Sequence, residues 1–297
     1  MQRIQEGAAV DSIRPDDRWR LLTRGYSRRD VVRRGGVVGL TAAAVAGWAR
    51  GHASAQDATP VAEPVENPAA SPVASPIIVT GEARFAYVGT YTRDAPGGGG
   101  TATAEGISVF AVAPGTGALS LVETIPSDNP SFLALDPAQN VLYAVNEIDD
   151  FEGGGNGSVE AYAIDPATGQ LSLINREDVG GAIPAHLAVD PTGSDVVVAN
   201  YVGGNFTVLP IREDGGLDPV SDSVQNTGSG PNAERQEAPH PHVVVFDPVG
   251  GFVATADLGI DLVQVFRLDT TTGELEPVSE VSVAPGAGPR HASPRHA

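Results

Sequence analysis

The sequence predicts an all-β fold of the β-propeller class, on three observations. Short β-rich runs recur from Arg84 onward without helical periodicity. They group into units of about 50 residues with four runs each. An Asp-Pro pair follows the first run in three units, at Asp136, Asp190 and Asp247. Repeated units of four short strands are typical of propeller blades.

The first strand of each unit is expected to begin at a proline, and the anchors are Pro130, Pro184 and Pro241, with Pro289 in a fourth such place. The expected strands lie within 84–91, 106–112 and 117–124, then 130–135, 140–147 and 157–164, then 184–189, 195–201 and 205–211, then 241–246, 252–258 and 262–268. A turn with Gly and Leu and a fourth run close each of the last three units. About four blades are therefore expected. The aspartates before proline are expected to form turns by binding their own backbone, not to act in catalysis.

The N-terminal region reads as a targeting segment. Arg28 and Arg29 follow Ser27, an uncharged run covers 35–48, and Ala53-Ser54-Ala55 resembles a signal-peptidase site. Residues 1–55 thus resemble a twin-arginine export signal, which implies a periplasmic, extracellular or cell-surface protein. The run is too short to span a bilayer stably, so no membrane span is expected after cleavage. A cytoplasmic amphipathic helix and an uncleaved anchor are the alternatives.

Composition separates the tail from the body. Residues 56–82 form a Pro/Ala-rich segment expected to be a disordered linker, and 83–297 hold the partial propeller. Residues 56–297 contain eight arginines, no lysine and 32 acidic residues, a net charge of −24. Such a body repels nucleic acid, so no nucleic-acid partner is expected. The absence of cysteine excludes disulfides and thiol nucleophiles, and the absence of G-x-S-x-G disfavours a serine esterase.

The C-terminal end predicts an unfinished ring. Pro289-Arg290-His291-Ala292 is echoed by the same four residues at 294–297, just where a further innermost strand is expected. The echo suggests a frameshift, a truncated gene or an assembly error. A natural four-bladed ring is the alternative. We expect a monomer if the ring is complete and self-association if it is truncated, because an open array exposes a blade face.

The innermost strands are expected to carry a site at the channel mouth. His242 and Arg290 stand one residue after their anchor prolines, and His186 and His291 stand two residues after theirs. Equivalent positions of successive blades gather around one mouth, so these side chains are expected to converge. Histidine can activate water near neutral pH. Arginine can stabilise an oxyanion or an anionic group.

The stretch "GSGPNAERQEAPHPH" enters the innermost strand at Pro241 and adds further candidates, Arg235, Glu237 and His240. Glu237 or Asp257 could orient a histidine. The alternatives are structural: His240 and His242 can cap a turn, and Arg235 can pair with a neighbouring glutamate at the surface.

Four segments carry a family resemblance: "GPNAERQEAPHPH", "VANYVGGNFTVLPI", "VATADLGIDLVQVFRLD" and "PGAGPRH". Over about 85–291 the chain resembles the lactonase family of seven-bladed β-propellers, which includes 6-phosphogluconolactonase and carboxymuconate-cyclising enzymes. The resemblance implies about four of seven blades and a hydrolase that opens a small-molecule lactone. With an unfinished ring, residues 1–297 alone are expected not to form a closed, active enzyme. It implies the catalytic residues His186, Arg235, Glu237, His242 and Arg290 and the substrate-binding residues His240, Asp257 and His291.

Neither a cofactor nor a metal is expected. Calcium-dependent lactonases are also propellers, but their sites are built from converging carboxylates and amides. Two other functions stay open, a carboxymuconate-type cycloisomerase and a non-enzymatic surface-layer or adhesion propeller. The charged insertion before Pro241 favours an enzyme, because adhesion repeats have no need of it in a single blade.

Overall fold

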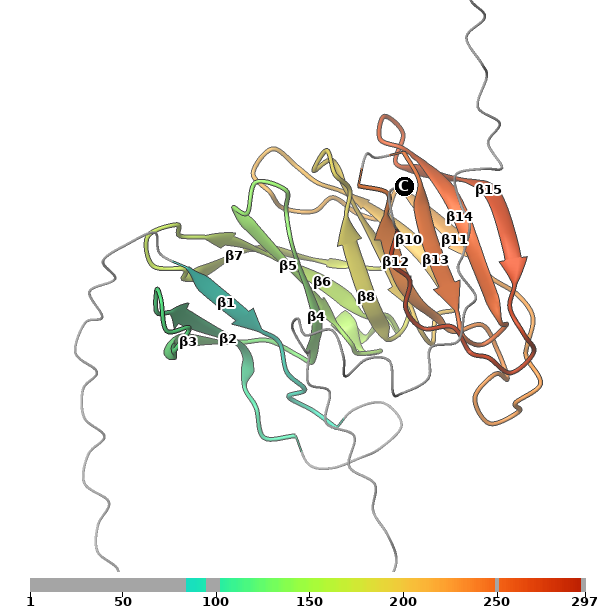
Figure 1. The fold of residues 1–297 in the computed structure, drawn as a ribbon, viewed down its shortest axis with the longest axis horizontal. Helices are drawn as coiled ribbons and strands as arrows, with labels where there is room; N and C mark the ends of the chain where they lie inside the picture. Colours follow the sequence, from blue (N-terminus) through green and yellow to red (C-terminus); the bar gives the residue numbers. More distant parts are fainter. Residues whose placement is uncertain (1–83, 95–101, 249–250, 295–297) are drawn as a thin grey trace, which may run out of the picture. The chain divides into compact units, whose positions relative to one another are not determined.

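The computed structural model describes residues 84–94, 102–248 and 251–294 (Figure 1). These ranges contain fifteen β-strands and one short 3₁₀ turn, Phe151–Gly153. The predicted all-β class is therefore confirmed. Within the same ranges, no helix has the length and apolarity needed to cross a membrane. The predicted export signal, its twin arginines and the boundaries at residues 55 and 82 lie outside the described residues.

The strands form four antiparallel sheets, each a meander in chain order. The first sheet has three strands, β1 (Phe85–Val88), β2 (Gly106–Val112) and β3 (Leu119–Pro126). The second has β4 (Pro130–Leu135), β5 (Val141–Asn146), β6 (Ser158–Ile164) and β7 (Leu171–Asp178). The third has β8 (Pro184–Val189), β9 (Asp195–Asn200), β10 (Asn205–Pro210) and β11 (Asp222–Gln225). The fourth has β12 (Pro241–Phe246), β13 (Val253–Asp257), β14 (Leu262–Asp269) and β15 (Glu274–Ser282). The predicted blades are confirmed, as are the anchor prolines Pro130, Pro184 and Pro241.

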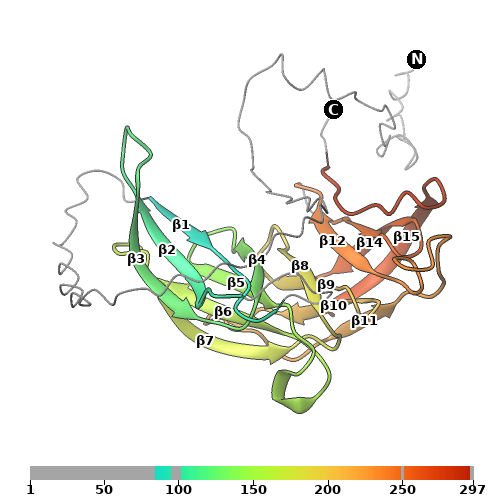
Figure 2. The same cartoon turned by 90° about the horizontal axis from the view of Figure 1, so that it is seen from below.

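Successive sheets pack face against face, and β8 lies between β4 and β12 (Figure 2). Three apolar clusters fill the three interfaces. One of them joins Phe206 of β10 to Phe266 of β14, with ring centroids 6.2 Å apart. Strands β5 and β9 are buried along their whole length. This burial on both faces explains why their sequences are nearly continuous apolar runs.

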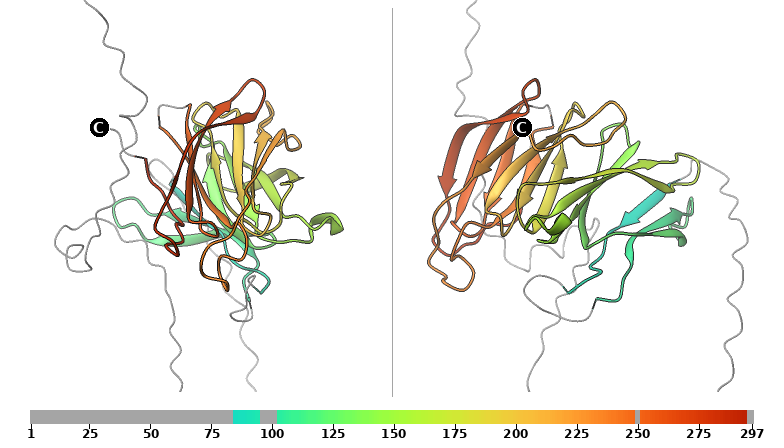
Figure 3. Two further views of the ribbon diagram at one scale, coloured as in Figure 1. Left: turned by 90° about the vertical axis from the view of Figure 1, so that its right-hand side faces the viewer. Right: turned by 180° about the vertical axis from the view of Figure 1, so that it is seen from behind.

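The innermost strands share one irregularity. The register shifts between Pro130 and Phe132, between Pro184 and His186, and between Pro241 and Val243. A β-bulge inserts a residue that has no partner and bends the strand, so it re-aims the neighbouring side chains. The bulges lie at equivalent ends of β4, β8 and β12. Figure 3 shows the same sheets from two further sides.

The turns after β4 and β8 confirm the expected role of their aspartates. Asp136 Oδ1 accepts hydrogen bonds from the backbone N–H groups of Asn140 and Val141 at 2.6 and 2.7 Å. Asp190 Oδ2 accepts from Ser194 and Asp195 in the same way. These carboxylates satisfy backbone donors of their own turns, which is the known preference of aspartate there.

The expected strand at Pro289 is not formed. Residues 283–294 follow β15 without regular secondary structure. A strand exists only through hydrogen bonds to a neighbouring strand, and this segment pairs with none of those described. The segment instead donates the Gly286 N–H to Asp261, in the turn between β13 and β14, and brings Arg290 to His242.

Phe206→Ala should destabilise the chain by about 3–5 kcal/mol, because the residue is fully buried between two sheets and its removal leaves a cavity. Urea unfolding followed by circular dichroism measures the change. Val202→Ala is the control, since Val202 is 54% exposed and its truncation should change stability by less than about 0.5 kcal/mol. Equal effects would show that this sheet interface contributes little.

Candidate functional site

Asp257, at the end of β13, fixes the entry to β12. The residue is fully buried. Its Oδ1 accepts from the backbone N–H groups of His240 and Gly259 at 2.7 and 2.9 Å, and its Oδ2 accepts from Asn226 Nδ2 at 2.8 Å. A Cβ at Gly259 would lie 1.9 Å from the Ala238 carbonyl oxygen, so only glycine permits this approach. The structure thus places Asp257 as a support of His240 and not at a substrate-binding surface.

Asp261 ties this loop to the C-terminal segment. It adopts φ +55°, a left-handed conformation that aspartate and asparagine tolerate better than most residues. Its Oδ1 accepts from Gln236 Nε2 and from the Gly288 N–H, both at 2.8 Å, and its Oδ2 accepts from the Gly286 N–H at 2.6 Å. One carboxylate therefore joins the motifs that contain Gln236, Asp261 and Gly288.

His240 is held between a carbonyl and a carboxylate. Its Nδ1 lies 2.9 Å from the Tyr201 carbonyl oxygen, and its Nε2 lies 3.0 Å from Glu237 Oε1. Both partners are acceptors, so the two hydrogen bonds coexist only when the imidazole carries both protons. The Tyr201 ring stacks on His240 at 4.4 Å. Hydrogen bonding by its own backbone N–H, then by His240, keeps the pKa of Glu237 below its usual range.

Arg235 makes no hydrogen bond or ion pair within this cluster of described residues and acts on it only through its charge, which helps to lower the pKa of Glu237. The residue is exposed, and its backbone N–H donates to the Asn232 carbonyl oxygen. Among the described residues, no ion pair joins Arg235 to Glu234 or Glu237. The structure therefore shows neither the predicted catalytic placement of Arg235 nor the surface pair that was its alternative.

Four of the predicted residues do converge, from β8, β12 and the C-terminal segment. Arg290 Nη2 lies 2.5 Å from His242 Nε2, and the His242 and His291 rings meet edge to face at 5.4 Å. His186 packs on Phe132 with ring centroids 3.8 Å apart, and its Nδ1 lies 3.5 Å from the Val244 N–H. The bulges in β8 and β12 explain how residues at different offsets from their prolines reach one place.

The two strand histidines are neutral near pH 7. Burial, then the neighbouring His242 and His291, lowers the pKa of His186 to about 3. Burial, then Arg290 and His291, lowers the pKa of His242 to about 4. A guanidinium can only donate, so Nε2 of neutral His242 accepts from Arg290 and its proton sits on Nδ1. Arg290 thus occupies the nitrogen that a general base would use.

Sequence reasoning missed a carboxylate beside this cluster. The Tyr91 hydroxyl donates to Glu147 Oε2 at 2.8 Å. Burial raises the pKa of Glu147, while hydrogen bonding to its carboxyl and then the positive charge of Arg290 act in the opposite direction. Glu147 directly follows β5, where the quoted run "NVLYAVNE" changes from apolar to charged. That change was the available signal, but a strand end beside solvent gives the same pattern.

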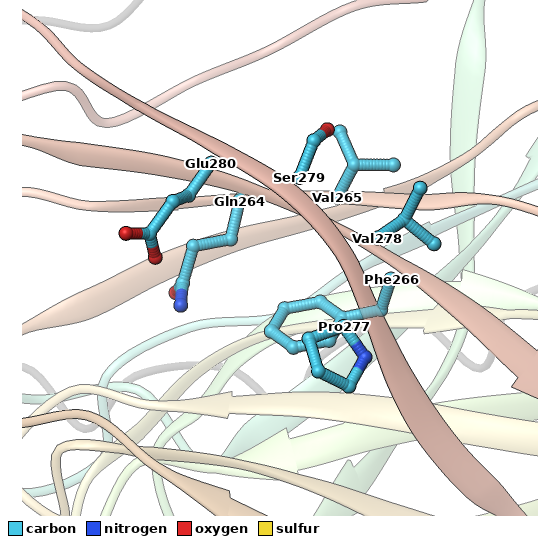
Figure 4. A pocket seen from close by; sticks show the side chains of 7 residues that line it. All are labelled: Gln264, Val265, Phe266, Pro277, Val278, Ser279 and Glu280. Atoms are coloured by element: carbon cyan, nitrogen blue, oxygen red, sulfur yellow. The ribbon is translucent and has the colours of Figure 1, made fainter. Parts of the chain in front are cut away.

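Two other features lie outside the cluster. A shallow pocket opens beside the register shift between β14 and β15, and Glu280 is its only ionisable lining residue (Figure 4). It has no histidine or arginine, so it does not suit ester hydrolysis. Within the described ranges, no three His, Cys, Asp or Glu side chains are placed to hold a metal ion together.

Successive four-stranded blades that bring histidine and arginine together at one end define a partial β-propeller with a candidate site. The family described as "Lactonase, 7-bladed beta-propeller" matches residues 85–295, so the chain belongs to this lactonase family. It is 39% identical over 207 residues to the 6-phosphogluconolactonase of Bacillus subtilis, covering 69% of this chain and 54% of the relative. It is 31% identical to the 6-phosphogluconolactonase of Formosa agariphila, over 69% and 56% of the two chains.

A solved structure supports the same assignment. The periplasmic gluconolactonase of Pseudomonas aeruginosa superimposes with a TM-score of 0.61 at 30% identity, over 70% of this chain and 57% of that one. The chain thus spans little more than half the length of the relatives that it matches.

Asp261→Asn should destabilise the protein at pH 7 by about 1–2 kcal/mol, because the amide keeps the left-handed backbone but loses an acceptor oxygen. Burial opposes ionisation of Asp261, but the Gly288 and Gly286 N–H groups outweigh it and lower its pKa. Its contribution is therefore present above the ordinary carboxyl pKa and is lost as the pH falls through the lowered value.

Thermal melting between pH 7 and pH 3 tests this expectation. The difference between Asp261→Asn and wild type should shrink at the acid end. Asp269→Asn, on an exposed turn, serves as the control and should melt like wild type at pH 7. A pH-independent difference would contradict the role given to the Asp261 charge.

Proposed function

We propose that the whole protein is a lactone hydrolase that uses the cluster of His186, His242, Arg290 and His291. Family membership supports the reaction class. The observation that carries the proposal is the direct contact of Arg290 with His242. Arg290 is a cation that can stabilise an oxyanion, and His242 is a group that can take a proton from water. The related proteins named 6-phosphogluconolactonase and gluconolactonase indicate sugar lactones as the first substrates to test.

The proposed mechanism starts with an exchange of partners. When the lactone carbonyl enters, Arg290 turns from His242 Nε2 to the carbonyl oxygen. This frees Nε2 and moves the positive charge of Arg290 away from the neutral imidazole. The pKa of His242 therefore rises, and His242 becomes a stronger base. Water then attacks the carbonyl carbon while His242 takes its proton. The ring C–O bond breaks, and the proton passes to the leaving alkoxide, which gives a hydroxy acid.

The other residues have supporting roles in this proposal. His186, neutral and packed on Phe132, binds the substrate through its Nε2–H group. The His291 ring packs edge to face against the His242 ring and shields it. The pair of Glu237 and His240 supports the wall of the site through Tyr201, whose ring meets both His240 and His242.

Hydrolysis by the whole protein, with its ring complete, tests the function. A pH-stat assay measures acid release from glucono-1,5-lactone, its 6-phosphate and an aromatic-acid lactone, with and without chelator. Acid release that requires His242 supports a hydrolase. Isomerisation of a carboxymuconate with no net hydrolysis would indicate a cycloisomerase, and inertness toward every lactone would favour the adhesion propeller.

Export and association stay predictions. We propose that residues 1–55 direct the protein through the twin-arginine route. Replacing Arg28 and Arg29 by lysine should retain the protein in the cytoplasm, as cell fractionation would show. Self-association of the chain is tested by size-exclusion chromatography.

Arg290→Gln should move the acid limb of kcat/KM to higher pH. In wild type the limb is expected near pH 4, the pKa of His242, because the base must be deprotonated. Removing the positive charge of Arg290 raises that pKa. Arg267→Gln is the control. It removes a charge from β14, on the outer side of the blade that carries His242, and should leave the pH of the acid limb unchanged. An unmoved limb in Arg290→Gln would exclude His242 as the base.

Arg290→Lys should reduce kcat by about 10²-fold or more, because an ammonium cannot reproduce the planar donors of a guanidinium. Arg235→Lys should reduce kcat much less, since Arg235 is exposed and lies outside the cluster. Far-UV circular dichroism verifies that both variants fold. A larger loss in Arg235→Lys would return Arg235 to the catalytic role that the family resemblance implies.

A further inference from the structure

We propose that Glu147, held by Tyr91, binds a hydroxyl group of the substrate and selects neutral polyhydroxy lactones over lactones that carry a phosphate or carboxylate. The inference rests on the proposed function, because it assigns a substrate class to the same site. It also adds a specificity-determining residue that the family resemblance did not supply.

The geometry begins with the position of Glu147 at the inner end of a blade. Strand β5 ends at Asn146, and Asn146 pairs with the anchor Pro130 of β4. Glu147 is therefore at the same level as the anchor prolines that precede His186 and His242. Its backbone N–H donates to the Asn129 carbonyl oxygen at 3.0 Å, so the main chain at this position is fixed.

The side chain is also oriented. Tyr91 comes from the segment after β1, in the preceding blade, and its hydroxyl donates to Glu147 Oε2. The same segment is anchored by Asn129, whose Oδ1 accepts from the N–H groups of Thr92 and Arg93 at 2.9 and 2.8 Å. Tyr91 is still 40% exposed, so the pair lies at an open surface and not in a sealed core.

Glu147 and Arg290 act on the same space. The positive charge of Arg290 lowers the pKa of both the Glu147 carboxyl and the Tyr91 hydroxyl, against the effect of burial. Arg290 also contacts His242. A ligand carbonyl at Arg290 would therefore have the Glu147 carboxylate within the reach of its own substituents.

The charges of this region favour a neutral ligand. His186 and His242 are uncharged near pH 7, and the Glu147 carboxylate offsets Arg290. Arg93, the nearest arginine of the preceding segment, is already bound by Asp128 and Asp150 at 3.0 and 2.7 Å. A phosphate would meet one compensated cation and a carboxylate, inside a strongly acidic protein. A sugar hydroxyl would instead donate to Glu147, and a site built to bind a hydroxyl discriminates strongly.

Binding and turnover are measured separately to test this. The ligands are two unreactive analogues, the lactam of gluconic acid and the lactam of 6-phosphogluconic acid, titrated by calorimetry into the full chain. Wild type should bind the neutral lactam at least about 10-fold more tightly, a difference of about 1.4 kcal/mol. Glu147→Gln should weaken the neutral lactam about 10-fold and strengthen the phosphorylated one. Glu213→Gln removes the same charge from the exposed loop after β10 and should keep the wild-type preference.

Turnover of the two matching lactones shows whether the proposed function and this inference fail together. Selective binding without hydrolysis would refute the hydrolase and retain the neutral-ligand site. Hydrolysis with equal or stronger binding of the phosphorylated lactam would retain the hydrolase and refute the role of Glu147. Failure to bind either lactam, or an unchanged preference in Glu147→Gln, would also overturn the inference.

Discussion

The carboxylate of Asp261 is the constraint on which the candidate site depends. It accepts hydrogen bonds from the loop before β12, through Gln236, and from the segment after β15, through Gly286 and Gly288. Neither segment belongs to a sheet, so neither has ladder hydrogen bonds that would fix its path. Through this one residue, Arg290 is positioned against His242. Asp257 acts in the same way on His240, and both aspartates come from the "ADLGID" turn.

The sheets supply the other half of the arrangement. Apolar contacts between successive blades hold β4, β8 and β12 side by side, and a bulge at the start of each strand turns the next residues out of the regular alternation. The histidines are therefore carried by a rigid scaffold, while the arginine is carried by a loop. A site of this kind can exchange the partner of the arginine without disturbing the packing of the blades.

Burial and charge decide what these histidines can do. In the resting arrangement the pKa values of His186 and His242 lie well below neutrality, so both imidazoles are uncharged and neither repels the nearby arginine. A base with so low a pKa is weak, and the contact with Arg290 is part of the cause. Moving that cation onto a substrate couples stabilisation of the oxyanion to activation of the base. The charge of Arg290 also acts on Glu147. Through Glu147, the move of Arg290 from His242 to the substrate depends on the charge of the ligand.

The sequence by itself determined the blades, because alternation, anchor prolines and Asp-Pro turns are local patterns that repeat with the fold. It also determined that His186, His242, Arg290 and His291 converge, since equivalent positions of a repeat lie together. Only the tertiary structure decided the rest. Arg235 and Asp257 lie in the same sequence motifs as the candidate functional residues. Arg235 is nevertheless exposed, and Asp257 is fully buried, with its carboxylate used in hydrogen bonds to the backbone. Glu147 and Tyr91 are 56 residues apart and meet through the packing of two blades, which no local pattern records.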